Sequence, residues 1–292
     1  MPTSVQITNN NQINTQQLCE IEALCEECNY TDGNTVAIYK HILSQNRPMP
    51  CNILCYQEKR LTGFLSTFFF YEDACEIVVM VAPDCRRHGI ARQMLYKILP
   101  LIASRAIKNL IFSSPHSLNN TWLSTEGFIY KSSEYQMQRL KNQPVAIDAQ
   151  KLVIRLATTA DIETLRTIDN ACFPTEPPNM SDRLQYLLND TNYKLFIIFK
   201  DGLPIGKAHV FEQQDNARLT DIGILPHLQG RGFGGYLLAH CINYCLSINQ
   251  SNIILDVETN NQQALNLYTH LGFSIINAYD FWSIPFNELI HL

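Results

Sequence analysis

The chain has 292 residues, of which 46% are hydrophobic and 17% charged, and its formal net charge at pH 7 is −5. This composition supplies enough apolar material for two cores, and the negative charge gives no sign of a nucleic-acid-binding surface. No apolar run approaches the roughly 18 residues of a membrane-spanning helix, and residues 1–6 do not form a signal peptide. We therefore expect a soluble cytoplasmic protein with neither a membrane nor a nucleic-acid partner.

Ten cysteines are present, and two close pairs near the N-terminus have spacings that a zinc site could use: Cys25 with Cys28, and Cys51 with Cys55. Cys51 and Cys55 lie in a strand-like stretch, which would hold them about 13 Å apart at the usual rise per residue. Thiols stay reduced in the cytosol, so we expect reduced structural cysteines and no metal.

The first feature of interest along the chain is a basic loop, residues 86–92, around Gly89. It follows an apolar, strand-like run that ends at Pro83. Residues 140–150 are polar and contain Pro144, which is typical of a linker. We expect one domain before this linker, residues 1–139, and a second after it, residues 151–292.

The second half has the pattern of a mixed α/β domain. The sequence predicts a helix over 162–171, which the prolines within 173–178 end. Strands are predicted over 193–199 and 205–212, joined by a hairpin turn at Asp201-Gly202. With the later segments, the order becomes β-α-α-β-β-β-α-β-α-β, a mixed α/β layer.

A glycine-rich loop, residues 229–235, reads Gln-Gly-Arg-Gly-Phe-Gly-Gly between a strand-like and a helix-like run. Backbone N–H groups at the start of a helix, together with the helix dipole, form an anion site. Glycine allows the backbone to approach the anion because no Cβ intervenes. The alternative is a tight loop without a ligand. No Gly-Lys-Ser/Thr sequence follows, so the segment is not a Walker loop.

The two loops are copies of one another. Four pairs of residues are separated by 143 positions: Pro83 and Pro226, Arg86 and Gln229, Gly89 and Gly232, Ala91 and Gly234. Gly63 and Gly206 share that offset, and Gly127-Phe128 corresponds to Gly272-Phe273 at an offset of 145. Similarity at a fixed offset over most of the chain indicates a duplicated domain.

The pattern Gln/Arg-x-x-Gly-x-Gly/Ala between a strand and a helix resembles the pyrophosphate loop of the GNAT superfamily of acyl-CoA N-acyltransferases. In the second copy, residues 153–161, 253–258 and 261–273 resemble the family's first strand, fifth strand and Asn…Ala…Leu-Tyr…Gly-Phe segment. In the first copy only the loop matches well. The resemblance implies two tandem GNAT-like domains, each a twisted mixed sheet flanked by helices, with a catalytic second domain and a degenerate first one.

The ligand that the resemblance implies is acetyl-CoA, the acyl donor. In the second copy its binding residues would be Ile222, Gly223, Ile224, Gln229, Gly230, Arg231, Gly232, Phe233, Gly234, Gly235 and Asn261. In the first copy they would be Val79, Met80, Val81, Arg86, Arg87, His88, Gly89, Ile90, Ala91 and Arg92.

Tyr268 matches the family tyrosine that lies near the sulfur and acts as general acid, although it could also be a core aromatic of an amphipathic helix. Asp256 matches an acidic position of the fifth strand and is our first candidate for the base, with Glu258 and Asp221 as alternatives. Asn261 could bind the coenzyme arm, cap its own helix, or do both.

The first copy departs from this pattern. Aligning on Gly127-Phe128 places Leu123 where Tyr268 lies and His116 where Asn261 lies. Because leucine cannot donate a proton, we expect the first domain to bind coenzyme or to be purely structural.

The function expected is that of an N-acetyltransferase acting on a primary amine of a small molecule or a protein. The alternative is a non-catalytic, coenzyme-A-binding regulatory protein. The acceptor, the acyl length and the oligomeric state stay open.

Overall fold

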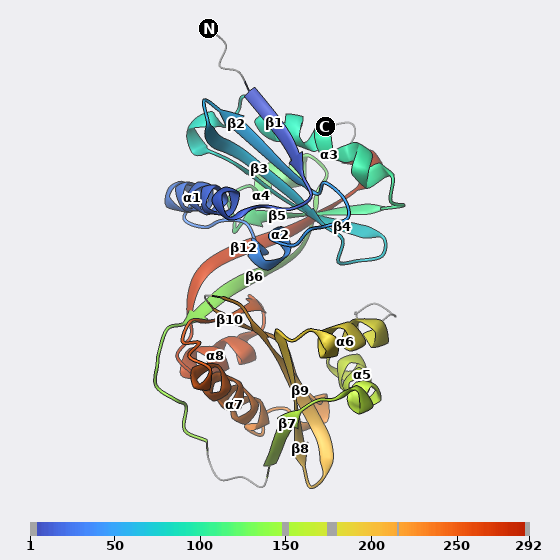
Figure 1. Cartoon of the computed structure of the whole chain (residues 1–292), viewed down its shortest axis with the longest axis vertical. Helices are drawn as coiled ribbons and strands as arrows, with labels where there is room; N and C mark the ends of the chain where they lie inside the picture. The colour runs from blue at the N-terminus through green and yellow to red at the C-terminus, as the bar shows by residue number, and fades with distance from the viewer. Residues whose placement is uncertain (1–4, 148–151, 174–179, 215, 290–292) are drawn as a thin grey trace. The chain divides into compact units, whose positions relative to one another are not determined.

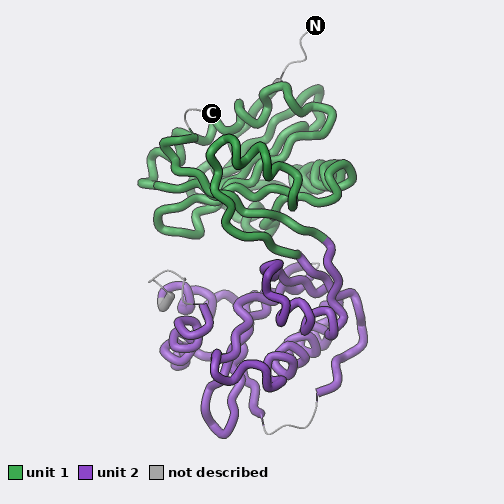
Figure 2. The backbone as a smooth tube through the Cα atoms, turned by 180° about the vertical axis from the view of Figure 1, so that it is seen from behind, with its two compact units in different colours: residues 1–135, 277–292 green, residues 136–276 purple. Residues whose placement is uncertain are grey.

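The computed structural model describes residues 5–147, 152–173, 180–214 and 216–289. It divides into two compact units, which Figure 2 colours separately: unit 1, residues 1–135 and 277–292, and unit 2, residues 136–276. Each unit is a mixed α/β layer, as the sequence predicted.

The elements of the first half of the chain follow one another in the order (Figure 1) β1 (Val5–Asn10), α1 (Thr15–Asp32), α2 (Lys40–Leu43), β2 (Asn52–Gln57), β3 (Arg60–Phe68), β4 (Ala74–Val81), α3 (Ile90–Ala103), β5 (Asn109–Pro115), α4 (Asn120–Thr125) and β6 (Ile129–Arg139). Those of the second half are β7 (Leu152–Leu156), α5 (Ile162–Cys172), α6 (Met180–Asn189), β8 (Tyr193–Lys200), β9 (Leu203–Glu212), β10 (Ala217–Ile224), α7 (Phe233–Ser247), β11 (Ile253–Glu258), α8 (Gln262–His270) and β12 (Ser274–Pro285), followed by the short α9 (Phe286–Leu289). Both halves therefore have the order β-α-α-β-β-β-α-β-α-β, which confirms the predicted order for the second half.

The sheet of unit 1 has the strand order β1-β2-β3-β4-β5-β12-β6, and that of unit 2 has the order β6-β11-β10-β9-β8-β7. In each unit one inner pair is parallel, β4 with β5 and β10 with β11. The hairpin-connected strands beside each of these pairs are antiparallel. A parallel pair places the ends of both strands at the same edge of the sheet, where a ligand can be held.

Part of the last strand of each half belongs to the other half's unit. Residues 277–285 of β12 belong to unit 1 and pair antiparallel with β5, from Tyr279 opposite Pro115 to Pro285 opposite Asn109. The end of β6 belongs to unit 2, where Gln138 donates a hydrogen bond to Asn252 (2.9 Å). The compact units therefore differ from the predicted boundaries 1–139 and 151–292 at these two strands. A repeat offset reports the order of elements and carries no information on which strand completes which sheet.

Part of the predicted linker, 140–150, contacts unit 2. The backbone N–H and C=O of Val145 bind the side-chain amide of Asn243 in α7 at 2.8 and 2.9 Å. Residues 148–150 of that linker lie outside the described part of the chain.

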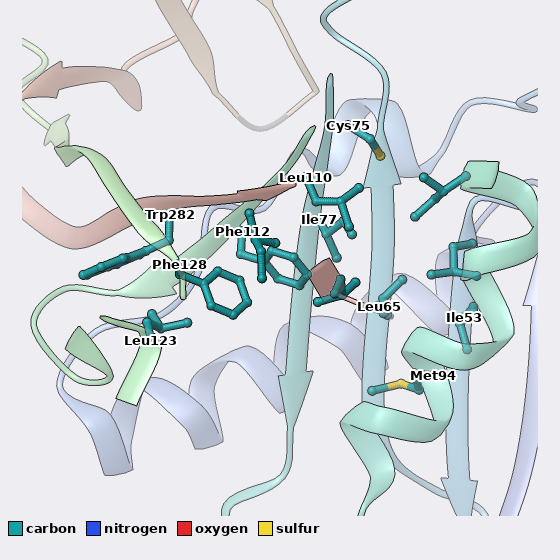
Figure 3. Close-up of a cluster of buried hydrophobic side chains, with 14 of the residues drawn as sticks. Ile53, Leu65, Cys75, Ile77, Met94, Leu110, Phe112, Leu123, Phe128 and Trp282 are labelled. Carbon is teal, nitrogen blue, oxygen red and sulfur yellow. The ribbon is translucent and has the colours of Figure 1, made fainter. Parts of the chain in front are cut away.

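Each unit packs helices on both faces of its sheet. In unit 1, α3 and α4 cover one face over an apolar cluster that Figure 3 shows, with Met94 on α3 and Leu123, Phe112 and Phe128 at its other side. Residues of α1 pack with Phe64, Phe68, Val78 and Met80 on the opposite face. In unit 2, α5 and α6 lie on one face of the sheet and α7 on the other (Figure 1).

Candidate active site

The two repeated loops have the same backbone conformation. Each begins with a short 3₁₀ turn, at Pro83–Cys85 in unit 1 and at Pro226–Leu228 in unit 2. Gly89 and Gly232, just before the helices α3 and α7, are both left-handed, with φ of 77° and 84°. Both helices thus begin with open N–H groups, which is the geometry that binds a phosphate.

One side chain braces each loop from inside. Gln229 donates a hydrogen bond from Nε2 to the carbonyl of Ile224 (2.9 Å), and Arg86 donates one from Nε to the carbonyl of Val81 (3.1 Å). The remaining Arg86 nitrogens form a bidentate pair with Asp32, at 2.8 and 2.6 Å. The first residue of the motif therefore holds the loop closed, and the Arg86 charge is already compensated within unit 1.

The parallel strands separate beside each loop. Pairing between β10 and β11 runs from Ala217 to Leu219 only, and pairing between β4 and β5 ends at Val78 opposite Ser113. Beyond these points the strands diverge, and their backbone groups are available to a ligand. The sequence prediction that a pantetheine arm lies along such a strand remains a prediction.

The cavity of unit 2 has a volume of about 350 Å³. Ten of the predicted site residues line it: Ile222, Ile224, Gln229, Gly230, Gly232, Phe233, Gly234, Gly235, Asn261 and Tyr268. Leu228, Leu238, Gln263, Ala264 and Leu267 complete the lining, and sequence reasoning did not identify them. The helix periodicity that places Tyr268 beside the loop could have identified Ala264, because it lies four residues before Tyr268 on the same helix face.

Tyr268 is 7% exposed and lies on α8, at whose start Asn261 accepts a hydrogen bond from the backbone N–H of Ala264 (3.1 Å). Burial raises the pKa of the Tyr268 hydroxyl to about 12. The phenol is therefore protonated at neutral pH and can donate a hydrogen. Asn261 caps its helix and also lines the cavity.

Three predicted residues of this copy lie elsewhere. Gly223 is on β10 but packs against Cys172, where an added Cβ would lie 3.0 Å from the thiol sulfur. Arg231 donates to the carbonyl of His227 (3.3 Å). Asp256 forms an ion pair with Arg218 and accepts a hydrogen bond from Gln136 (3.4 Å). Among the described residues that line the cavity, Asp256 is not present.

A buried charge network lies on the opposite face, at the bulge where β9 and β10 shift register between Thr220 and Gly223. Asp221, with φ of 49°, contacts His209 (3.2 Å) and Arg183 (3.0 Å), while the fully buried Lys207 pairs with Asp169. Burial raises the pKa of Asp221, but the hydrogen bond and charge of His209 and the charge of Arg183 outweigh it and hold the pKa well below its usual range. Asp221 is thus a weak proton acceptor, and the network fixes the bulge.

The cavity of unit 1 is larger, at about 610 Å³. It is lined by eight of the predicted residues: Val79, Val81, Arg86, Arg87, Gly89, Ile90, Ala91 and Arg92. The other two are not among its lining residues. Met80 lines a neighbouring cavity on the α1 side, and His88 contacts the carbonyl of Cys85 (3.3 Å).

Helix α4 of unit 1 corrects one detail of the repeat alignment. Asn119 is the residue before α4, as Asn261 is before α8, and it lines the unit 1 cavity. His116 lies before it and binds the buried carboxylate of Asp280 (2.7 Å). The Asn119 position was missed because α4 has six residues and α8 has nine, so an alignment from the C-terminal Gly-Phe displaces the start of the helix. Leu123 keeps the position of Tyr268, because its carbonyl accepts from Phe128 as that of Tyr268 accepts from Phe273.

Glu76 on β4 is a buried carboxyl group that the sequence did not single out. It is 3% exposed, and its Oε1 has no hydrogen-bond partner among the described residues. Burial raises the pKa of Glu76 to about 7, although a hydrogen bond from Tyr39 acts in the opposite direction. In register it lies beside Phe68 and Ile111, within the sheet of unit 1.

Glu76 predicts a pH dependence of stability. Between its ordinary pKa of 4.5 and the folded value of about 7, folded unit 1 keeps a proton that the unfolded chain releases. The stabilisation is therefore complete below pH 4.5 and is lost as the pH rises to 7, a change of about 3 kcal/mol in the free energy of unfolding. Glu76→Gln should flatten this dependence in urea unfolding curves recorded between pH 4.5 and 8. The exposed Glu72→Gln is the matched control, and an equal slope in wild type and Glu76→Gln would contradict the prediction.

Neither a metal site nor a membrane-spanning helix is found where the structure describes the chain. No group of three or more His, Cys, Asp or Glu side chains there could hold a metal ion, and the cysteines are free thiols, of which Cys28, Cys51 and Cys55 are buried. Within the same residues, no helix is both long and apolar enough to cross a membrane.

Comparisons with known proteins agree with this geometry. Residues 15–120 and 162–273 each match the sequence model of the acetyltransferase (GNAT) family. The chain is 24% identical over 216 residues to a mycothiol acetyltransferase of Mycobacteroides abscessus, which covers 68% of this chain and 70% of that protein. A GCN5-related N-acetyltransferase of Sphaerobacter thermophilus has the same fold, with a TM-score of 0.77 at 14% identity over 97% of this chain and 96% of that one. A tandem GNAT protein of the clavulanic acid biosynthesis pathway gives 0.67 at 14% identity over 97% and 99%.

Proposed function

The chain belongs to the GNAT family of acetyltransferases, and on that premise we propose that unit 2 transfers an acetyl group from acetyl-CoA to a primary amine. The observation that carries the proposal is the composition of one cavity. The glycine loop, Asn261 and the protonated Tyr268 all line the same space of about 350 Å³. A phosphate site and a proton donor in one cavity suit a thioester substrate.

The donor would lie with its pyrophosphate on the loop N–H groups of Gly230 to Gly235. Its pantetheine arm would follow β10 where this strand leaves β11, beside Ile222 and Ile224. The loop has no acidic side chain, so nothing in it repels the phosphates. Asn261, at the start of α8, would contact the arm near its sulfur end.

The reaction is attack of a neutral amine on the thioester carbonyl. A C–N bond forms, the tetrahedral intermediate collapses, and the C–S bond breaks. The Tyr268 hydroxyl transfers its proton to the sulfur as the C–S bond breaks, and the phenolate then takes a proton back from solvent. No carboxylate is among the described residues that line the cavity, so the proton of the amine passes to solvent. Asp256, held by Arg218, has no part in this proposal.

Unit 1 is proposed to bind the coenzyme without turnover. Its loop has the backbone of the catalytic copy and lines a cavity with Arg87 and Arg92, whose positive charges suit phosphates. Leu123 takes the position of the proton donor and has no hydrogen to give. The resemblance of the two units thus extends to binding and ends at the chemistry.

The decisive test is coenzyme A release from acetyl-CoA in the presence of a panel of primary amines, both small molecules and peptides with a free N-terminus. A thiol reagent reports release, and mass spectrometry identifies an acetylated amine. We expect release above the hydrolysis rate with at least one class of acceptor. Tight acetyl-CoA binding without release for any class would favour the non-catalytic, coenzyme-A-binding regulator instead.

A further inference from the structure

The cavity of unit 1 is larger than the corresponding cavity of unit 2. Its volume is about 610 Å³, against about 350 Å³ for the counterpart. Helix α4, with six residues, is shorter than α8, with nine, and Leu123 stands where Tyr268 contributes an aromatic ring. Both changes reduce the side-chain volume that this helix contributes to its unit.

The additional space is apolar. Part of its apolar lining is formed by Leu95 and Leu99 of α3, Phe112 of β5, Phe128, and Leu289 of α9. Leu99 lies ten residues beyond Gly89 along α3, so this part is called the deep end of the cavity. Phe112 and Phe128 pack edge to face, with ring centroids 5.4 Å apart, and Figure 3 shows them together with Leu123. Leu99 lies 143 positions before Ile242 of unit 2, which is fully buried and is not among the residues that line the unit 2 cavity. The extension is therefore specific to unit 1.

The mouth of the same cavity has the opposite character. Arg87 and Arg92 line it together with the left-handed Gly89 at the start of α3. Positive charge and open N–H groups at one end, with hydrocarbon at the other, complement a molecule that carries phosphates at one end and an alkyl chain at the other.

We propose that unit 1 binds acyl-CoA thioesters whose acyl group is a hydrocarbon chain longer than acetyl, with the phosphates at the Gly89 loop and the chain at the Leu99 end. The proposal rests on the proposed coenzyme binding by unit 1. Burial of each methylene group is worth roughly four-fold in affinity when it is complete. Ordering of the chain and partial exposure reduce this gain, so octanoyl-CoA should bind at least about 10-fold more tightly than acetyl-CoA.

The experiment uses the full chain carrying Gly232→Glu, which removes coenzyme binding by unit 2. Coenzyme A, acetyl-CoA, octanoyl-CoA and octanoic acid are titrated by calorimetry. Fluorescence provides a second readout, because Trp122 lines the cavity and is 53% exposed. We expect octanoyl-CoA to bind at least about 10-fold more tightly than acetyl-CoA, and octanoic acid alone to bind far more weakly.

The other outcomes separate the two proposals. If coenzyme A and its esters all fail to bind, coenzyme binding by unit 1 is wrong and the inference falls with it. If acetyl-CoA and octanoyl-CoA bind equally, coenzyme binding stands and the chain site is refuted. If octanoic acid bound as tightly as octanoyl-CoA, the proposal of an acyl-CoA ligand would also be refuted, and the ligand would be a free fatty acid.

Two variants test the location. Leu123→Tyr restores the residue of unit 2, and Leu99→Phe adds volume at the deep end. Each should reduce the preference for octanoyl-CoA to below about three-fold and leave the affinity for coenzyme A unchanged. Leu99→Phe provides the test if Leu123→Tyr does not fold, as judged by circular dichroism. An unchanged preference in the folded variants would overturn the placement of the chain.

Discussion

Replacing Tyr268 by phenylalanine is expected to lower kcat by about 10²–10⁴-fold, the usual contribution of a general acid. The ring, which packs 6.1 Å from that of Phe273, stays in place, and only the hydroxyl is lost. Because the hydroxyl acts as the C–S bond breaks, the loss should appear in kcat, with little change in the affinity for acetyl-CoA. Steady-state kinetics at saturating acceptor, together with calorimetry of acetyl-CoA binding, measure the two effects separately.

The matched control for Tyr268→Phe is Tyr186→Phe, because Tyr186 lies on α6 in the same unit and is 63% exposed. Both variants lose one phenolic oxygen, but only one loses it from the cavity. Full turnover by Tyr268→Phe at saturating substrate would show that its hydroxyl has no catalytic part, and would leave Tyr268 as a core aromatic residue.

Gly232→Glu is expected to abolish acetyl-CoA binding by unit 2 and, with it, nearly all turnover. Gly232 has a φ of 84°, a backbone conformation that residues with a Cβ rarely adopt. It lies at the N-terminus of α7, where the backbone N–H groups have no partner within the helix. A carboxylate there repels the phosphates and blocks the backbone approach. Calorimetry on the full chain should show the number of coenzyme sites falling from two to one.

Gly202→Glu is the control, since Gly202 is also left-handed, with φ of 80°, has open space around it and lies in the β8–β9 hairpin away from the cavity. It introduces the same charge and the same backbone strain. Gly89→Glu is the counterpart in unit 1 and should remove the other coenzyme site. If turnover disappeared in Gly89→Glu and persisted in Gly232→Glu, with both proteins folded, the catalytic unit would be unit 1.

The parts of the site that the sequence predicted are those that depend on local structure. The loop geometry around Gly89 and Gly232 follows from a few adjacent residues, and the helix that carries Asn261 and Tyr268 follows from its own periodicity. Even Gly63 and Gly206, noticed only for their offset, have a physical role: an added Cβ would lie 2.9 Å from Ile90 in one case and 2.5 Å from the Gly223 carbonyl in the other. Positions of this kind can be identified before any fold is known.

The residues that escaped prediction depend on neighbours distant in the chain. The pairing of Asp256 with Arg218 requires β10 and β11 to be adjacent, and nothing in either segment shows that a charge will be compensated. The bulge at Asp221 is fixed by His209 and by Arg183, from two other elements. The placement of the end of β6 and of most of β12 in the other half's unit is the extreme case, because neither strand carries a local signal for the strands that it will pair with.

That placement sets the order in which the protein can be completed during synthesis. All of unit 2, including the end of β6, has been synthesised before residue 277 is added, whereas unit 1 still lacks residues 277–285 of β12. At about 5–20 residues per second, β5 waits on the order of ten seconds with an unpaired edge. Unit 1 is thus the first to begin and the last to close, and a chain that stopped before residue 277 would carry a complete unit 2 attached to an open sheet.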